Sequence, residues 1–565
     1  MEIRGKLSAI VAACGAVAAA WLLAAVPAHA SADMETVLQD DNQIVYQDDP
    51  QRLDQALARI KSLGIDTVRV SLYWHLVAPD PTHRRRPDFG DKGPADPASY
   101  PQDRWRRYDR IVKLAGQNGL NVYFSITGPA PLWATRGSRV RDINNTRPNA
   151  RDFRAFVTAV GKRYSGSYPD PDAPPPSSST PTTPVTPALP VSTDPPEESS
   201  AVIPRVDRWS IWNEPNFPFW LGPQWKRVGR RYRPITPTLY RRLADAAWSG
   251  LQSTGHSGDV ILLGETAPYG PHNPKRPGVK GLMSIPTFVR ELYCLNRRYR
   301  PYHGHQARVR ACPTTAKSRG RFRTTHPALF EATGWAHHGY SLTRAPTFKG
   351  RRTDAAPLGA LYRLTRVLDR SQFRWGAESA EWPIWLTEYG YQTLPPDPVR
   401  GVSWRRQASW MSWAEYLAYR NPRVDAFANF LLVDDKPRRG FRRNDKRRWV
   451  TWQSGFMTAG HREKPAFEEF RHPIYITPRR ARRGRAARVF GLLRTAPYDT
   501  PLPARIEFAG RDGNWRTLAS VTVTNPRGYL LKRIHPPGSG VVRIAWTDPE
   551  TGAEIDSRAQ SIVRR

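Results

Sequence analysis

The chain of 565 residues contains only three cysteines, and one of them, Cys14, lies in an apolar run at the amino terminus. So few cysteines argue against a metal centre built from thiolates, and we expect neither a metal nor another cofactor. The other two, Cys294 and Cys312, bracket a segment with many Lys and Arg residues. We expect them to form a disulfide in an oxidising compartment; two free buried thiols are the alternative.

Acidic residues are also scarce, with 50 Asp and Glu against 86 Lys and Arg, which gives a net charge of +36. An intracellular protein of this charge would be expected to bind nucleic acid. Two other interpretations remain for an exported chain. The charge attracts the protein to an anionic cell surface or acidic polysaccharide, or the sequence is simply rich in arginines that lie at solvent-exposed positions. The second is favoured because no single predicted helix concentrates the charge.

A long apolar run near the amino terminus extends from Leu7 to Val26. It follows the charged start Met1–Lys6 and precedes Ala28-His29-Ala30, a small-x-small pattern of the kind that signal peptidase accepts. The sequence therefore predicts a signal peptide over residues 1–30 and a secreted, extracellular protein. An uncleaved membrane anchor through residues 7–26 is the alternative.

Strand-like and helix-like segments alternate through most of the chain, which is typical of parallel βα units. The expected strands are Gln43–Tyr46, Thr67–Trp74, Asn121–Ile126, Val206–Trp212, Val260–Gly264, Gly334–Tyr340, Ile384–Thr387 and Ala426–Val433. Eight such units are what a closed (β/α)8 barrel needs. The predicted fold class is therefore α/β, a TIM barrel over residues 31–472.

Two parts of the sequence depart from this alternation. Residues 168–200 are dominated by Pro, Ser and Thr, and are predicted to form a disordered insertion within the barrel. After Pro473 the pattern changes to short alternating strands separated by turns, which predicts a small antiparallel β-sandwich domain over residues 473–565. A carbohydrate-binding role and a packing or spacer role for this domain are both left open.

Two glutamates carry the clearest chemical signal, because each directly follows an apolar strand and stands beside aromatic residues. Glu214 lies in Trp-Asn-Glu-Pro-Asn after the fourth expected strand, and Glu388 lies in Thr-Glu-Tyr-Gly after the seventh. In a barrel both would reach the face formed by the carboxyl ends of the strands, where the active sites of such enzymes lie. Paired carboxylates are what glycosidic bond cleavage requires: one protonates the leaving oxygen and the other attacks the anomeric carbon.

These two motifs resemble those of the clan A retaining glycoside hydrolases over roughly residues 43–471. The run Asn216–Trp220 is similar to the β-xylosidase and α-L-iduronidase family, glycoside hydrolase family thirty-nine. The resemblance implies that Glu214 is the general acid/base and Glu388 the nucleophile. It also implies that Arg69 and Tyr340 hold the nucleophile, and that Asn213 donates to the sugar 2-hydroxyl.

Other residues were considered as substrate contacts. We expect the rings of Trp209, Trp212 and Phe217 to desolvate Glu214 and so to raise its pKa. His338 is expected to hydrogen-bond to the substrate or to Glu214; neither it nor His337 has a third metal ligand at suitable sequence spacing. Glu265, after the fifth strand, is either a lining residue or unrelated to the site. Trp133 either stacks on a sugar or packs in its loop.

The sequence departs from the clan at the end of the eighth strand, where a tryptophan commonly forms the floor for the sugar. This chain reads Asn429-Phe430-Leu431, so Phe430, Trp449 or Trp452 would have to supply the ring. The predicted function is a secreted retaining glycosidase whose partner is a carbohydrate substrate, without nucleic acid or an obligate protein partner. The alternative is a catalytically silent glycan-binding protein at the cell surface.

Overall fold

The computed structural model describes residues 31–137, 145–173, 201–270, 278, 280–377, 381–482, 484–496 and 500–564. The predicted leader, with its anchor alternative, lies outside the described residues, as does residue range 174–200 of the predicted insertion. The ends that flank this range meet in an antiparallel bridge between Pro169 and Val202.

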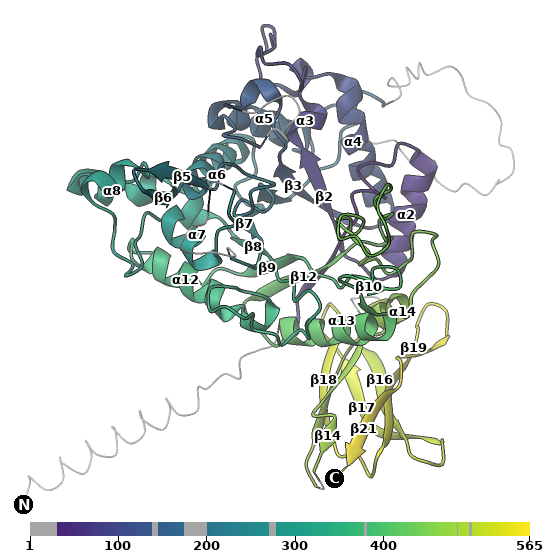
Figure 1. Ribbon diagram of the computed structural model, residues 1–565. Helices are drawn as coiled ribbons and strands as arrows, with labels where there is room; N and C mark the ends of the chain where they lie inside the picture. The colour runs from purple at the N-terminus through teal and green to yellow at the C-terminus, as the bar shows by residue number, and fades with distance from the viewer. Residues whose placement is uncertain are drawn as a thin grey trace, which may run out of the picture.

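Eight parallel strands close into a barrel in the order β1-β12-β9-β8-β7-β4-β3-β2 (Figure 1). They are β1 (Glu35–Gln39), β2 (Thr67–Tyr73), β3 (Asn121–Thr127), β4 (Arg208–Ile211), β7 (Val260–Thr266), β8 (Gly334–His338), β9 (Ile384–Glu388) and β12 (Val424–Phe430). The predicted (β/α)8 barrel is therefore confirmed.

The prediction for the first strand is wrong. Residues 41–46 form a turn, and the strand that pairs with β2 and β12 is Glu35–Gln39. Asp40 explains the difference, because its carboxylate accepts hydrogen bonds from the backbone N–H groups of Gln43, Leu432 and Val433. This polar anchor folds the apolar run into a buried turn.

Side chains alternate between the two faces along most of each barrel strand. On β2, Val68, Val70 and Leu72 pack against the surrounding helices, whereas Arg69 points into the barrel with Ser71. The lower interior is filled by a small apolar cluster of Val37, Tyr123, Leu262, Ala336, Trp385, Ala426 and Ala428. Polar side chains occupy the interior above this cluster, at the carboxyl ends of the strands.

Helices follow each strand and form the outer ring (Figure 1). The main ones are α2 (Pro50–Ser62), α4 (Gln102–Gln117), α5 (Ala150–Arg163), α6 (Thr236–Gln252), α7 (Ile285–Leu292), α12 (Tyr362–Phe373), α13 (Trp404–Tyr419) and α14 (Pro465–Arg471). In α2, Asp49 caps the first turn, and Leu53, Leu57 and Ile60 recur at helical spacing on the buried face.

Shorter elements lie in the connecting loops. They are α3 (Trp74–Val77), η1 (Pro97–Ser99), η2 (Leu132–Ala134), the β5 (Trp225–Val228) and β6 (Arg231–Pro234) hairpin, α8 (Gly304–Arg308), α9 (Ala316–Gly320), α10 (Phe322–Thr325), α11 (Ala328–Glu331), η3 (Leu358–Ala360), β10 (Thr393–Leu394) and β11 (Val402–Ser403). No described helix is long and apolar enough to span a bilayer.

The carboxyl-terminal strands form two sheets with their own apolar core, as the predicted sandwich requires. One sheet has β13 (Ile474–Thr477), β15 (Ala487–Leu492) and β18 (Tyr529–Ile534); the other has β14 (Arg480–Ala481), β16 (Leu502–Ala509), β17 (Trp515–Val523), β19 (Gly540–Thr547), β20 (Glu554–Asp556) and β21 (Gln560–Arg564). Tyr475 and Phe490 pack at a tilt against the Tyr416 ring of α13, and Arg494 pairs with Glu415 at 2.5 Å in the buried interface. These contacts support a packing role for the domain.

Candidate active site

Arg69 is the centre of a buried polar network at the mouth of the barrel. Its side chain is 0% exposed and contacts acceptors from several strands. Nη1 donates to Glu388 Oε1 at 3.0 Å, Nε to Glu265 Oε1 at 3.2 Å, and Nη2 to Asn213 Oδ1 at 2.8 Å; a further contact joins it to Gln39. Burial alone would lower the pKa of Arg69, but the two carboxylates raise it, so the guanidinium stays charged.

The two predicted catalytic glutamates lie close together across this mouth. One carboxylate oxygen of Glu214, one of Glu388 and a ring nitrogen of His338 all lie within 4.8 Å of one another. The side chain of Glu214 is 14% exposed and that of Glu388 is 10% exposed. Both therefore reach solvent while their neighbours in the network are fully buried.

His338, on β8, connects the glutamates. Its Nδ1 lies 2.9 Å from Glu214 Oε1 and 3.3 Å from Glu388 Oε2, and its Nε2 lies 3.0 Å from Glu265 Oε2. Burial opposes the charged form of the ring, but Glu388, Glu214 and Glu265 outweigh it and raise the pKa of His338 to about 10. The imidazolium can then donate one proton downward to Glu265 and the other toward the catalytic pair.

Glu265 lies beneath the site and not within it. Its carboxylate is 0% exposed and accepts hydrogen bonds from Arg69, Tyr123 at 2.6 Å, Ser210 at 2.5 Å, Thr387 at 2.5 Å and His338. Burial raises the pKa of this carboxyl group, but Arg69 and His338 together hold it well below its usual range. Both carboxylate oxygens already accept hydrogen bonds from the protein, so the structure gives Glu265 an anchoring role, which neither of the two alternatives left open by the sequence describes.

A local break in β7 aims Glu265 inward. The pairing of β7 with β8 shifts register between Leu263 and Thr266, and Gly264 and Glu265 both have positive φ values, 105° and 43°. Gly264 is required there because an added Cβ would collide with Trp335. The glycine before Glu265 was the available sequence signal for this inward turn.

Glu388 is held at both oxygens, as the sequence predicted for Arg69 and Tyr340. While Arg69 donates to Oε1, the Tyr340 hydroxyl donates to Oε2 at 3.0 Å. The pKa of Glu388 is raised above its usual value, mainly by burial and further by the charge of Glu214, while His338 and Arg69 limit the rise. The two cationic neighbours are therefore what favours the ionised form that a nucleophile needs.

The side-chain oxygen of Asn213 is hydrogen-bonded within the site, whereas its amide nitrogen is available to a ligand. Its Oδ1 accepts from Arg69, and its backbone N–H donates to Thr127 Oγ1 at 3.0 Å. Among the described residues no hydrogen bond is formed by its Nδ2. A donor next to Glu214 is thereby left for a ligand.

An aromatic wall stands behind Tyr340. Trp452, from the loop after β12, stacks on Tyr340 with ring centroids 5.1 Å apart and meets Phe430 edge-on at 5.4 Å. Trp449, in contrast, is buried and donates its indole N–H to the Arg443 carbonyl. Of the three rings that the sequence left as candidates, Trp452 is thus the one that stacks on Tyr340, the residue that donates to Glu388.

Three of the expected neighbours of Glu214 lie elsewhere or make other contacts. Trp209 points out of the barrel and donates to Asp259 at 2.9 Å, and Trp212 packs edge-on against Phe153 of α5. Phe217 meets Phe219. The side-chain contact that the structure records for the Glu214 carboxylate is the His338 imidazole. The expected desolvation of Glu214 by Trp209 is therefore wrong, whereas that by Trp212 and Phe217 stays a prediction.

Trp133, weighed as a sugar-stacking ring, and His337, weighed as a metal ligand, both have packing roles. Trp133 in η2 lies edge-on to Trp74 and Phe89 and donates to the Pro79 carbonyl at 3.0 Å. His337 faces the helices, where Thr266 and the Ala356 carbonyl satisfy its ring nitrogens. Burial lowers the pKa of His337 to about 4, which keeps it neutral.

Glu214, His338 and Glu388 also have the spacing of a metal-binding group, which the sequence spacing did not reveal. A metal ligand must offer a free lone pair, so histidine has to be neutral to bind. Both ring nitrogens of His338 already lie at hydrogen-bonding distance from carboxylates, Nδ1 from Glu214 and Glu388 and Nε2 from Glu265. The donor set therefore fits a hydrogen-bonded catalytic cluster better than a metal centre.

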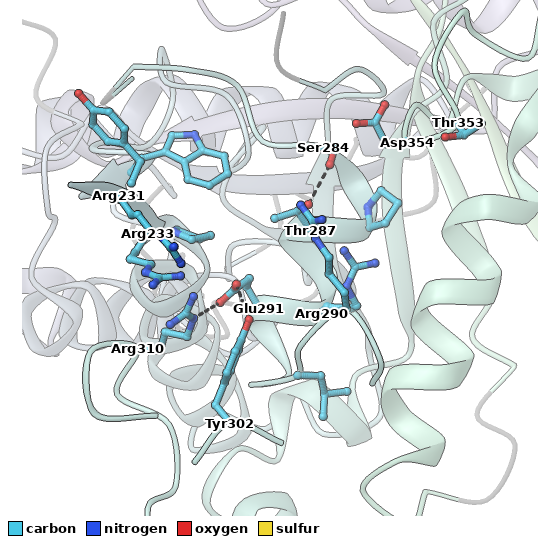
Figure 2. Close-up of a pocket in the computed structure, with 16 residues that line it drawn as sticks. Arg231, Arg233, Ser284, Thr287, Arg290, Glu291, Tyr302, Arg310, Thr353 and Asp354 are labelled. Carbon is cyan, nitrogen blue, oxygen red and sulfur yellow. Dashed lines mark hydrogen bonds and ion pairs between the residues drawn. The ribbon is translucent and has the colours of Figure 1, made fainter. Parts of the chain in front are cut away.

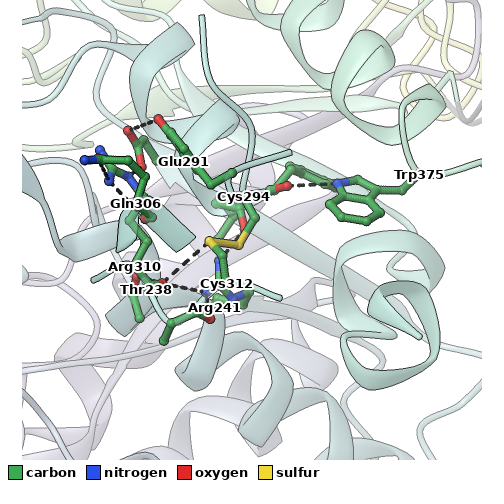
Figure 3. Close-up of a disulfide and its surroundings, with 12 residues drawn as sticks. Thr238, Arg241, Glu291, Cys294, Gln306, Arg310, Cys312 and Trp375 are labelled. Atoms are coloured by element: carbon green, nitrogen blue, oxygen red, sulfur yellow. Dashed lines mark hydrogen bonds and ion pairs between the residues drawn. A yellow bond between two sulfur atoms is a disulfide. The ribbon is translucent and has the colours of Figure 1, made fainter. Parts of the chain in front are cut away.

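The predicted disulfide between Cys294 and Cys312 is present, with their Cα atoms 5.6 Å apart (Figure 3). It fixes the segment after α7 to the barrel together with Arg241, which donates to the carbonyls of Leu292, Arg310 and Ala311. This segment lies outside the catalytic cluster but borders a separate cleft.

The sequence matches no protein-family model, and the search of curated proteins also gave no match. Solved structures with a similar shape include a GH5_18 protein from Streptomyces cattleya in complex with GlcNAc, at 15% identity, over 78% of this chain and 79% of that one, with a TM-score of 0.40. A family 1 β-glucosidase from Thermotoga maritima is 12% identical, over 74% and 85% of the two chains, with a TM-score of 0.41. A hyperthermophilic β-glucosidase from Pyrococcus furiosus is 14% identical, over 75% and 82%, with a TM-score of 0.40. At these scores the fold is established by the closed strand order of the chain itself.

Proposed function

We propose that the protein is a retaining glycoside hydrolase with Glu388 as nucleophile and Glu214 as general acid/base. The observation that carries this proposal is the pair of carboxylates whose oxygens lie within 4.8 Å of one another at the carboxyl ends of β4 and β9. Retaining enzymes hold their carboxyl groups about 5 to 5.5 Å apart, whereas inverting enzymes leave about 6.5 to 9.5 Å for a water. The observed spacing supports the retaining mechanism.

The charge of the buried network supports the division of roles. Arg69 and His338 carry two positive charges, and Glu265 and Glu388 carry two negative charges, so these four groups balance. Glu214 is the additional, more exposed carboxyl group at the edge of this set. Its Oε1 lies 2.9 Å from His338 Nδ1, which joins it to the network.

In the first step, Glu388 attacks the anomeric carbon while Glu214 gives its proton to the glycosidic oxygen, so that the leaving alcohol departs and a glycosyl ester forms. In the second step, Glu214 takes a proton from water, whose oxygen attacks the same carbon and releases Glu388. Arg69 and Tyr340 hold the Glu388 oxygens in position through both steps. Asn213 Nδ2 is the group available for the sugar 2-hydroxyl.

Trp452 is the ring on which the sugar would stack, in place of the clan's strand-eight tryptophan. The likeness to family thirty-nine stays a prediction, as does export through the amino-terminal leader. Carbohydrate is the proposed partner.

A panel of aryl glycosides of xylose, arabinose, glucose, galactose and uronic acids tests the proposal. We expect turnover of at least one, with the first product formed in the same anomeric configuration as the substrate by proton NMR. An inverted first product would contradict the assignment of Glu388 as nucleophile. Binding to a glycan array without hydrolysis of any sugar would instead favour the silent glycan-binding protein.

A further inference from the structure

A cleft of about 740 Å³ runs along the outer side of α7, between the β5–β6 hairpin and the segment that the disulfide closes (Figure 2). This volume falls within the range of about 300 to 1,000 Å³ that is usual for ligand sites. Glu214 and Glu388 are not among its lining residues. The cleft is therefore separate from the catalytic pair, although the loops that form it follow β4, β7 and β8.

Arginines dominate the charge of this cleft. Arg231 and Arg233 come from β6, Arg290 from α7, and Arg297 from the segment between the cysteines. Within the described part of the chain, none of these four guanidinium groups forms an ion pair with a carboxylate. The cleft thus carries four positive charges that no carboxylate of the described residues pairs with.

The two acidic residues of the cleft are already paired. Glu291 contacts Arg310 Nε at 2.7 Å and accepts from the Tyr302 hydroxyl at 2.7 Å (Figure 2). Asp354 pairs with Arg352 at 3.2 Å. They leave the remaining arginines free to bind an external anion. Guanidinium groups suit this task because their planar donors match carboxylate and sulfate oxygens in pairs.

The walls of the cleft are held in place before any ligand binds. The disulfide and Arg241 fix the segment that carries Arg297, and the Trp225 indole N–H donates to the Gly281 carbonyl at 2.7 Å. Trp225 and Tyr232 add aromatic faces beside the arginines. Aromatic rings pack against the apolar faces of pyranoses, and a preformed wall reduces the entropy lost on binding.

We propose that this cleft binds an anionic carbohydrate, a stretch of polysaccharide that bears carboxylate or sulfate groups. The guanidinium groups would bind the acidic substituents and the aromatic rings would contact the sugar faces. Such a site holds an acidic chain on the same protein that carries the catalytic pair. It depends on the lining residues of the cleft and stands whether or not Glu388 is the nucleophile.

The test uses the full chain and isothermal calorimetry with a galacturonic acid tetramer, a heparin-derived tetrasaccharide and a neutral galactose tetramer. We expect at least one acidic oligosaccharide to bind, the neutral one not to bind, and binding to weaken as salt screens the charges. The two acidic probes distinguish carboxylate from sulfate. In the double variant Arg231→Gln and Arg297→Gln, the affinity should fall at least about tenfold, because two charge-assisted contacts are lost.

The matched control is the double variant Arg227→Gln and Arg298→Gln. It removes the same charge from exposed positions in the same two segments, which do not line the cleft. We expect its affinity to stay within about twofold of the unmodified chain, since exposed charges outside the contact are screened. All four positions are exposed, so both variants should unfold at the temperature of the unmodified chain.

Three results would overturn the proposal. One is the absence of binding to both acidic oligosaccharides, and another is an equal loss of affinity in the two double variants, which would reduce the effect to net charge. The third is equally tight binding of an oligothymidylate with the same loss in the Arg231 and Arg297 variant, which would identify a general polyanion surface.

Discussion

Arginine serves opposite purposes in two regions of this molecule. At the barrel mouth, Arg69 is fully buried and contacts Glu265, Glu388 and Asn213. In the α7 cleft, Arg231 and Arg297 are exposed and form no ion pair with any described residue. Both regions are strongly charged, but only the cleft has charge left over.

The difference shows that pairing, and not the number of charges, decides what a charged group can do. At the mouth, Arg69 and His338 hold carboxylates in position. Their positive charges therefore affect a reaction only through the glutamates that they contact. In the cleft, a charge without a partner is available to a ligand. If this is correct, substitutions at the mouth should disturb charges that are paired within the protein. Substitutions in the cleft should affect only the binding of an external ligand.

The largest effect is expected from Glu388→Ala. Turnover of the best aryl glycoside should fall on the order of 10⁴-fold or more, because the nucleophile is lost. Added azide should restore activity by attacking from the vacated face, and the glycosyl azide formed should have inverted configuration by NMR.

Two controls accompany this variant. Glu214→Ala should give a glycosyl azide of retained configuration, because Glu388 still forms the ester there. The Arg231→Gln and Arg297→Gln variant should turn over a small neutral aryl glycoside at the unmodified rate. Full activity in Glu388→Ala would place the chemistry outside the mouth.

Glu265→Gln should destabilise the protein by about 3 to 5 kcal/mol, because it removes one partner from a buried, hydrogen-bonded set of charges. Urea unfolding without substrate measures this loss. Glu331→Gln, at an exposed carboxylate of α11, should change stability by less than about 0.5 kcal/mol. A Glu265→Gln protein with unchanged stability and a raised KM would make Glu265 a substrate contact.

His338 makes the stability of the mouth depend on pH. Its pKa is raised to about 10 in the folded chain, compared with about 6.5 when unfolded. The contribution of His338 to the free energy of unfolding is therefore complete below pH 6.5, and it is lost as the pH rises toward 10.

Unfolding in urea at several pH values should show this as a difference between the unmodified chain and His338→Gln. That difference should shrink by on the order of 3 kcal/mol between pH 6.5 and 10. A difference that stays constant over this interval would mean that His338 is not charged in the folded protein.

The smallest effect is expected from the aromatic residues. Trp452→Ala should raise KM for the best aryl glycoside about tenfold, because a sugar would lose one stacking face. Trp225→Ala, which removes a half-buried tryptophan from the cleft, should leave that KM unchanged. Equal increases in both variants would contradict the separation of the two regions.

Sequence reasoning could place Glu214 and Glu388 because both follow apolar strands in a barrel pattern. Once eight parallel units are counted, residues at the carboxyl ends must share one face. The expectation that Arg69 and Tyr340 contact Glu388 came from the resemblance to clan A, and both hydrogen bonds are present.

The role of Glu265 could not be predicted, because its direction depends on a register break in β7 and its partners come from separate strands. The first strand was misplaced because Glu35–Gln39 carries polar residues that are satisfied only inside the barrel, such as Gln39 on Arg69. Trp452 could not be singled out because loop conformation decides which ring reaches Tyr340.

The most direct test of the central claim is to trap the glycosyl ester. The unmodified chain is treated with an activated 2-deoxy-2-fluoro glycoside of the sugar that the aryl panel identifies, digested, and analysed by mass spectrometry. The balanced network at the mouth predicts a single covalent adduct on Glu388. An adduct on Glu214 or Glu265 would contradict it.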